Sequence, residues 1–209
     1  MAADHAGSAD AVAVLAAAGD LAACSSESEL REQVLSLSAL VGTDGILTAD
    51  MRPAADRRSE PVMSADVSDP SVYGRTIATV FSEHWRDHPI VVRHMRRPTP
   101  QAVTLADFSG ADRWLRIAIL HELFRARRPP YEAGVQVTWS PARVRCVALH
   151  RDVPFTARDR EVLDLIAPHL RAAHRRVAAA AGQALRLALL ERGLEVHGEG
   201  AVLVGRDGR

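Results

Sequence analysis

The hydrophobic pattern of the N-terminal third predicts two helices and a strand. Residues 10–24 are rich in alanine and predict the first helix. Ser26 and Glu29 have the spacing of a capping box, and the apolar stripe that follows them predicts a second helix ended by Gly42. Residues 46–51 then predict a strand. This opening suits a mixed α+β domain.

The middle of the chain alternates short strands with helical patterns. The helical patterns are residues 70–88, which we expect to end by Pro89, and residues 111–124. The strands are expected at residues 61–65, 102–105, 135–139 and 144–150, the last two as an antiparallel pair. In residues 135–139, Val135, Val137 and Trp139 alternate with Gln136 and Thr138, which predicts one packed face and one polar face.

The C-terminal part predicts one long helix. Thr156 is expected to cap it, with Asp159 near its start, where a carboxylate favours the helix dipole. Pro168 lies inside the apolar pattern and removes a helical hydrogen bond, so we expect a kink or a restart there. This helix either pairs with its twin in a homodimer or folds back on its own sheet. The candidate residues for dimer contacts or signalling are Leu163, Ile166, Leu170, Leu185 and Leu189.

Length and charge narrow the possible classes. The chain has 209 residues with 47% hydrophobic residues, which suits one domain of about 150 residues and an extension. All 26 basic residues are arginine. Residues 1–70 hold 4 Arg against 12 Asp and Glu, while residues 71–209 hold 22 against 14. A basic second half could bind nucleic acid, but these arginines are scattered among acidic residues, which favours a solvated surface.

The two cysteines and the N-terminus indicate the cytoplasm. Cys24 and Cys146 lie far apart without secretory context, so we expect buried thiols in a reducing compartment. The first residues are acidic and polar, and the apolar run after them is too short to span a bilayer.

Catalytic and metal-binding patterns are weak. His84 and His88 share a helical face, but His94 lies across Pro89 and completes no standard metal motif. Ser109 lacks the frame of a hydrolase nucleophile, and there is no glycine-rich phosphate loop. We therefore expect no enzyme, no catalytic residue, no metal and no cofactor. A metal-dependent enzyme built on His84 and His88 is the weakest alternative.

One block of sequence carries a resemblance to a known family. The run from residue 150 to 176 contains an Arg-Asp pair, a Phe-Thr-x-x-Asp-Arg cap, a leucine-rich helix and Pro-His-Leu. The matching residues are Arg151, Phe155, Asp159, Arg160, Pro168, His169 and Leu170. It resembles the end of the GAF-like sensor region of LuxR-family helix-turn-helix transcriptional regulators from high-GC bacteria. Ile166-Ala167 departs from the Leu-Arg that usually precedes Pro-His-Leu.

The resemblance implies a GAF-like antiparallel sheet flanked by helices, with a long C-terminal helix. We expect a disordered segment at residues 1–9, a sensor domain at 10–176, a signalling helix at 177–199 and the start of a truncated segment at 200–209. No turn and recognition helix follow the Arg-Glu-Val-Leu run, so the DNA-binding domain is expected outside this chain.

The function implied is signal sensing in a cytoplasmic homodimer, with a possible small-molecule effector. Expected pocket residues are Trp114, Tyr131, Trp139 and Cys146, although core packing would also explain them. A stand-alone GAF-like protein-interaction module is the alternative.

Overall fold

The sheet is built from antiparallel neighbours throughout. The computed structural model describes residues 2–43, 45–52, 62–67, 88–108, 131–140 and 143–197. Its elements are α1 (Ala2–Ala23), α2 (Glu27–Ser36), α3 (Ser38–Val41), β1 (Gly45–Arg52), β2 (Val62–Val67), α5 (Pro89–Arg96), β3 (Val103–Thr104), the 3-10 turn η3 (Leu105–Asp107), β4 (Tyr131–Ser140), β5 (Arg143–Arg151) and α8 (Ala157–His197). The strand order is β2-β1-β5-β4-β3. The expected α+β class is confirmed.

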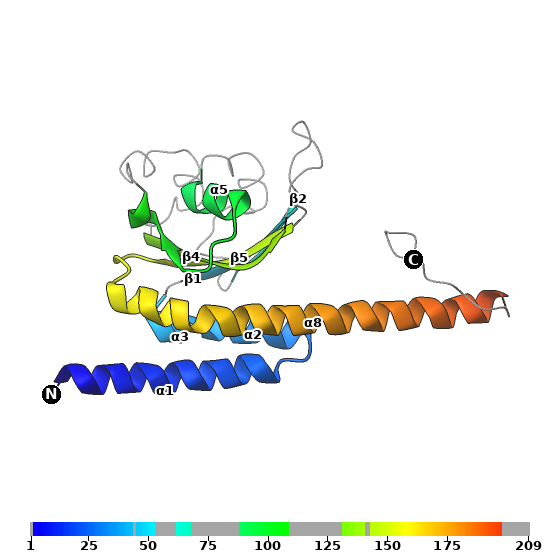
Figure 1. Cartoon of the computed structure of the whole chain (residues 1–209), viewed down its shortest axis with the longest axis horizontal. Coiled ribbons are helices and arrows are strands. Elements are labelled where there is room, and N and C mark those ends of the chain that lie inside the picture. Colours follow the sequence, from blue (N-terminus) through cyan, green and yellow to red (C-terminus); the bar gives the residue numbers. More distant parts are fainter. Residues whose placement is uncertain are drawn as a thin grey trace.

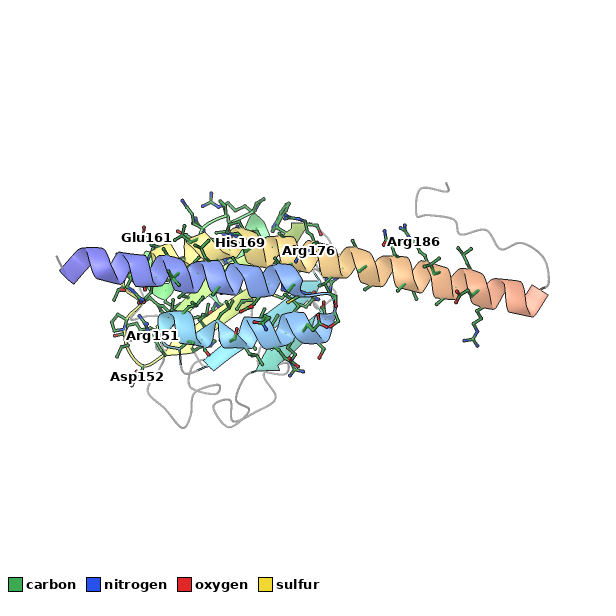
Figure 2. All side chains as sticks on the ribbon, turned by 90° about the horizontal axis from the view of Figure 1, so that it is seen from below. Arg151, Asp152, Glu161, His169, Arg176 and Arg186 are labelled. Atoms are coloured by element: carbon green, nitrogen blue, oxygen red, sulfur yellow. The ribbon has the colours of Figure 1, made fainter. Side chains whose placement is uncertain are left out.

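Helices cover the two faces of the sheet unequally. Figure 1 shows α1, α2, α3 and α8 below the sheet and α5 above it. α1 runs alongside α8 in both views (Figures 1 and 2). The main core lies between the sheet and the lower helices, with Leu21, Leu30, Ile46, Leu149 and Ile166 all 1% exposed or less.

The expected caps are present. The Ser26 side chain accepts a hydrogen bond from the Glu29 main-chain N–H at 3.2 Å, and the Glu29 carboxylate accepts one from Ser25 N–H at 2.8 Å. Gly42 ends α3 with φ of 61°, the left-handed region in which glycine is favoured. Thr156 and Asp159 cap α8 reciprocally, at 3.2 and 2.8 Å. Two polar caps and one glycine therefore set three helix boundaries.

Four sequence-based expectations differ from the structure. α1 begins at Ala2, so residues 2–9 are helical where disorder was expected. Pro89 begins helix α5, with His88 as its N-cap, where the end of a helix was expected. Proline fits the first helical turn, whose N–H groups have no helical partner. α8 continues through Pro168 without a restart, and it follows one line there (Figure 1). The fourth difference is the side on which Trp139 lies, described below. Residues 71–87 and 111–124, expected to be helical, lie outside the described residues.

Helix α8 changes character along its length. Leu163, Ile166 and Leu170 are each 2% exposed or less and pack in the core, so they are not available for dimer contacts. Val177 is buried at 2%, whereas residues 178–189 are all exposed. Beyond Val177 the helix extends past the sheet and does not fold back on it (Figure 1). Leu185 and Leu189 are 61% and 49% exposed.

A partly buried polar network joins the sheet to the lower helices. Arg145 on β5 donates to Glu27 Oε1 at 2.8 Å and to Asp50 Oδ2 at 2.9 Å, and its Nη1 lies 3.0 Å from His174 Nδ1. Burial, helped by the charge of Arg145, lowers the pKa of His174 to about 4. His174 is therefore neutral near pH 7 and accepts from Arg145 through Nδ1.

The signature residues hold the start of α8 against the sheet. Arg151 donates to Asp159 Oδ2, to Val41 O at 2.6 Å and to Pro154 O at 2.6 Å. Its guanidinium lies 4.2 Å from the ring centroid of Phe155. Arg160 binds Thr104 and Asp107, Leu170 is in the core, and Pro168 and His169 are exposed. Figure 2 shows Arg151 at one end of the domain and His169 farther along α8. Arg151, Arg160 and Leu170 therefore have structural roles here.

Two further findings, on membrane spans and on the cysteines, concern the described ranges alone. No helix within them combines the length and hydrophobicity needed to cross a membrane. Cys24 and Cys146 are both free and buried, as expected.

Replacing Arg151 by Met leaves the buried Asp159 carboxylate without its main partner. We expect a loss of about 3 kcal/mol in the free energy of unfolding, the cost typical of breaking a buried ion pair. Urea unfolding followed by circular dichroism measures it. Arg158→Met is the control, because Arg158 is 52% exposed, has Asp10 as its main partner and reaches Asp159 only at 3.4 Å. Equal losses in both variants would contradict this role of Arg151.

Candidate functional site

The upper face of the sheet, toward α5, is buried and carries polar side chains from β4 beside apolar ones such as Leu47 and Met51 from β1. Side chains on β4 alternate, so Ala133 and Val135 join the main core while Glu132, Gly134 and Gln136 point the other way. A Cβ at Gly134 would lie 2.5 Å from Ile90 Cγ2 and 3.0 Å from His94 Cε1. Glycine therefore allows α5 to lie directly on β4.

A buried carboxylate lies at the centre of this face. Glu132 is 3% exposed, and its Oε2 is 3.0 Å from His88 Nε2 and 3.6 Å from His150 Nε2. Burial alone would raise the pKa of Glu132, but the charge of His88 and hydrogen bonds from His150 and His88 outweigh burial and lower it well below its usual range. The carboxylate is ionised near neutral pH and links β4, β5 and the start of α5.

Two polar rings on this face, those of the buried His94 and the partly buried Trp139, have buried nitrogen atoms without a hydrogen-bond partner. Among the described residues, Nδ1 and Nε2 of His94 and Nε1 of Trp139 have no hydrogen-bond partner. His94 is 0% exposed, and burial lowers its pKa to about 4. Neutral His94 thus offers one donor and one acceptor, and Trp139 offers one donor. Buried groups of this kind normally find a partner, so a polar group is expected to bind here.

Cys146 adds a soft, apolar surface to the same face. It is 4% exposed and pairs with Gln136 across the strands. Burial, reinforced by the negative charge of Glu132, raises the pKa of its thiol to about 12. The thiol therefore remains protonated and acts as a small apolar side chain, not as a nucleophile.

A β-bulge brings Trp139 to the polar face. Strand pairing is interrupted between Gln136 and Thr138, after which Thr138 pairs with Arg145 and Trp139 pairs with Val144. Partners across a ladder share a face, so Trp139 lies on the side of Gln136 and Cys146. The expected alternation, with Trp139 beside Val135 and Val137, is wrong because of the one-residue bulge.

The structure brings together only part of the sequence-predicted pocket. Trp139 and Cys146 share the upper face. Tyr131 pairs with Arg151 on the opposite side and is 44% exposed, so it belongs to no such pocket. Trp114 lies outside the described residues. The structure therefore places Trp139 and Cys146 on one face and Tyr131 on the other, and the role of these residues in ligand binding stays a prediction.

Sequence reasoning missed the most polar members of the site. His88 and His94 were considered only as metal ligands, and Glu132, Gln136 and His150 were not singled out. The available signal was a charged residue, Glu132, at the start of a strand otherwise rich in apolar residues. Over the described ranges, no group of three or more His, Cys, Asp or Glu side chains could hold a metal ion.

Comparison with known proteins identifies the fold. No family model matches the sequence, and no curated protein matches it. The VqsR ligand-binding domain from Pseudomonas aeruginosa superposes with a TM-score of 0.55 and 16% identity, covering 84% of this chain and 98% of that one. This chain has the fold of a LuxR-type sensor domain.

Two other solved structures add context. CepR2 from Burkholderia cenocepacia is described as an N-acylhomoserine lactone dependent LuxR-family transcription factor. It matches with a TM-score of 0.57 and 16% identity, over 81% of this chain and 96% of that chain. A structure of SdiA in complex with octanoyl-rac-glycerol matches with a TM-score of 0.50 and 11% identity, over 82% of this chain and 66% of SdiA.

The buried imidazole of His94 makes stability depend on pH. Its folded pKa of about 4 lies below the ordinary 6.5, so the unfolded chain binds more protons in this range, and stability falls as the pH drops from 6.5 to 4. His94→Leu should remove this contribution, which amounts to about 3 kcal/mol at most. Urea unfolding at several pH values measures it. An unchanged pH slope in His94→Leu would contradict a neutral buried His94.

Proposed function

We propose that this protein is a signal-sensing regulatory domain that binds a small neutral effector on the α5-facing side of its sheet. The observation that carries the proposal is that buried ring nitrogens of His94 and Trp139 on that face have no hydrogen-bond partner among the described residues. An effector with a carbonyl and a hydrogen-bond donor would satisfy them both, and Cys146 would contact its apolar part. The likeness to ligand-binding regulators gives independent support for the same function.

The output of this domain is proposed to pass through α8 to a DNA-binding domain outside these 209 residues. α8 is the one described helix that both packs on the sheet and extends beyond it. An effector can shift such a helix only if it binds one position of the domain more tightly than another. The GAF-like relationship, the high-GC bacterial origin, the cytoplasmic location and the absence of enzymatic activity are part of this proposal and are predictions.

We further propose that the exposed end of α8 pairs with its twin in a homodimer. Leu185 and Leu189 lie one helical turn apart on the same side, and both are exposed. Pairing would remove this apolar surface from water.

Trp139→Phe keeps the ring and removes the indole N–H. With octanoyl-rac-glycerol and an N-acylhomoserine lactone as probes, we expect titration calorimetry to give at least one dissociation constant for the wild-type chain. The variant should weaken it about tenfold, the value of one buried hydrogen bond. Tyr131→Phe is the control on the opposite face. Equal weakening by both substitutions, or no binding of either probe by the wild-type chain, would count against the proposed site.

The dimer is tested by Leu185→Glu combined with Leu189→Glu. Two carboxylates on the contact stripe should dissociate the dimer, and sedimentation velocity should show the mass fall to that of a 22.6 kDa monomer. Leu187→Glu is the matched control, because its equally exposed side chain lies on another side of the helix. A wild-type chain that sediments as a monomer at high concentration would refute the pairing.

A further inference from the structure

We propose that residues 97–107, here called the strap, couple α5 to α8, and that Arg171 is the residue that positions the strap on α8. This inference rests on the proposed function, because it names the route by which occupancy of the α5 face would reach the signalling helix. α5 and α8 lie on opposite faces of the sheet (Figure 1). The strap begins directly after α5 and contains both the edge strand β3 and the turn η3.

Gln136 fixes the beginning of the strap on the α5 side. Its side-chain Nε2 donates to the main-chain oxygens of His94 at 2.7 Å and Arg97 at 3.3 Å, while its Oε1 accepts from Thr99 N–H at 2.5 Å. Gln136 is 3% exposed. A buried amide that is satisfied on both sides holds the end of α5 and the first residues of the strap as one unit.

Arg171 fixes the same region on the α8 side. Its Nη2 donates to Pro100 O at 2.6 Å and Thr99 O at 3.4 Å, and its Nε donates to the main-chain oxygen of Gln136 at 2.9 Å. Gln136 thus binds α5 through its side chain and α8 through its backbone. The β-bulge begins at Gln136, so this point of the sheet is locally distorted where the two contacts meet.

Two more residues of α8 continue the attachment along the strap. The Asp164 carboxylate accepts from Ala102 N–H at 2.5 Å, and Arg160 donates to Thr104 Oγ1 at 2.9 Å and Asp107 Oδ1 at 2.8 Å. Residues 160, 164 and 171 lie within about 40° of one another around the helix at 100° per residue. One side of α8 therefore carries three polar attachments to the strap.

The three attachments hold the strap firmly on α8. A strap held in this way can pass a movement of α5 on to α8. A shift of α5 away from the sheet would pull on Gln136 and Thr99, and both are joined to Arg171. Of these three α8 residues, Arg171 contacts the part of the strap next to α5, whereas Arg160 and Asp164 hold its far part. Arg171 should consequently control how much α8 responds to α5, while Arg160 and Asp164 maintain the edge of the sheet.

The experiment displaces α5 without any ligand. Gly134→Ala places a methyl group against Ile90 and His94 and forces α5 outward. Hydrogen exchange measured by mass spectrometry then reports on residues 164–176 of α8. With Arg171 present, we expect Gly134→Ala to speed exchange there about tenfold. In an Arg171→Met background, adding Gly134→Ala should cause no further change in α8.

Arg176→Met is the matched control on the same helix, because Arg176 binds Leu21 O and Ala22 O of α1 at 2.8 and 3.0 Å and does not touch the strap. In that background the response to Gly134→Ala should persist. If Gly134→Ala fails to fold, Ile90→Ala loosens the same contact and replaces it. Faster exchange in α5 with an α8 response that is identical with and without Arg171 would overturn the proposal. Because no effector is added, this result is separate from the outcome of the ligand titrations.

Discussion

The ionised carboxylate of Glu132 is the constraint around which the upper half of the domain is arranged. A carboxylate buried to 3% exposure would be costly without partners, and His88 and His150 supply them. His88 is also the N-cap of α5, where its Nδ1 accepts from Val91 N–H at 3.4 Å. One histidine therefore ties the beginning of α5 to the centre of the sheet, and Gln136 ties its end.

The two faces of the sheet differ in the polarity of their buried side chains. The lower face is apolar apart from the Arg145 network and the Arg151–Asp159 pair, and it supports the core with α1, α2 and α8. The upper face keeps polar groups in a dry environment, some of them without partners among the described residues. A fold whose only need was stability would fill such positions with apolar side chains. Their presence favours a site that is completed by a bound molecule.

The sequence predicted the lower half of the domain better than the upper half. Caps such as Thr156 with Asp159 and the stop at Gly42 are local signals, and the structure has both. Helix α5 was missed because its Ile-Val-Val run is typical of a strand and Pro89 was taken as a helix end. The position of Trp139 depends on a β-bulge, and no turn residue or glycine marks that bulge. Glu132 contacts His88, which lies more than 40 positions earlier in the chain, so only the folded structure brings the two side chains together.

Binding of an effector to the α5 face through His94 and Trp139 would change the surroundings of both rings. Its most direct test is a ¹H–¹⁵N correlation spectrum of the labelled chain during titration with octanoyl-rac-glycerol and an N-acylhomoserine lactone, with the Trp139 indole signal assigned by Trp139→Phe. A probe that binds should shift the Trp139 indole N–H together with amides of α5 and β4. Shifts confined to α1 and the exposed end of α8, with the Trp139 indole unchanged at saturation, would contradict binding at this face.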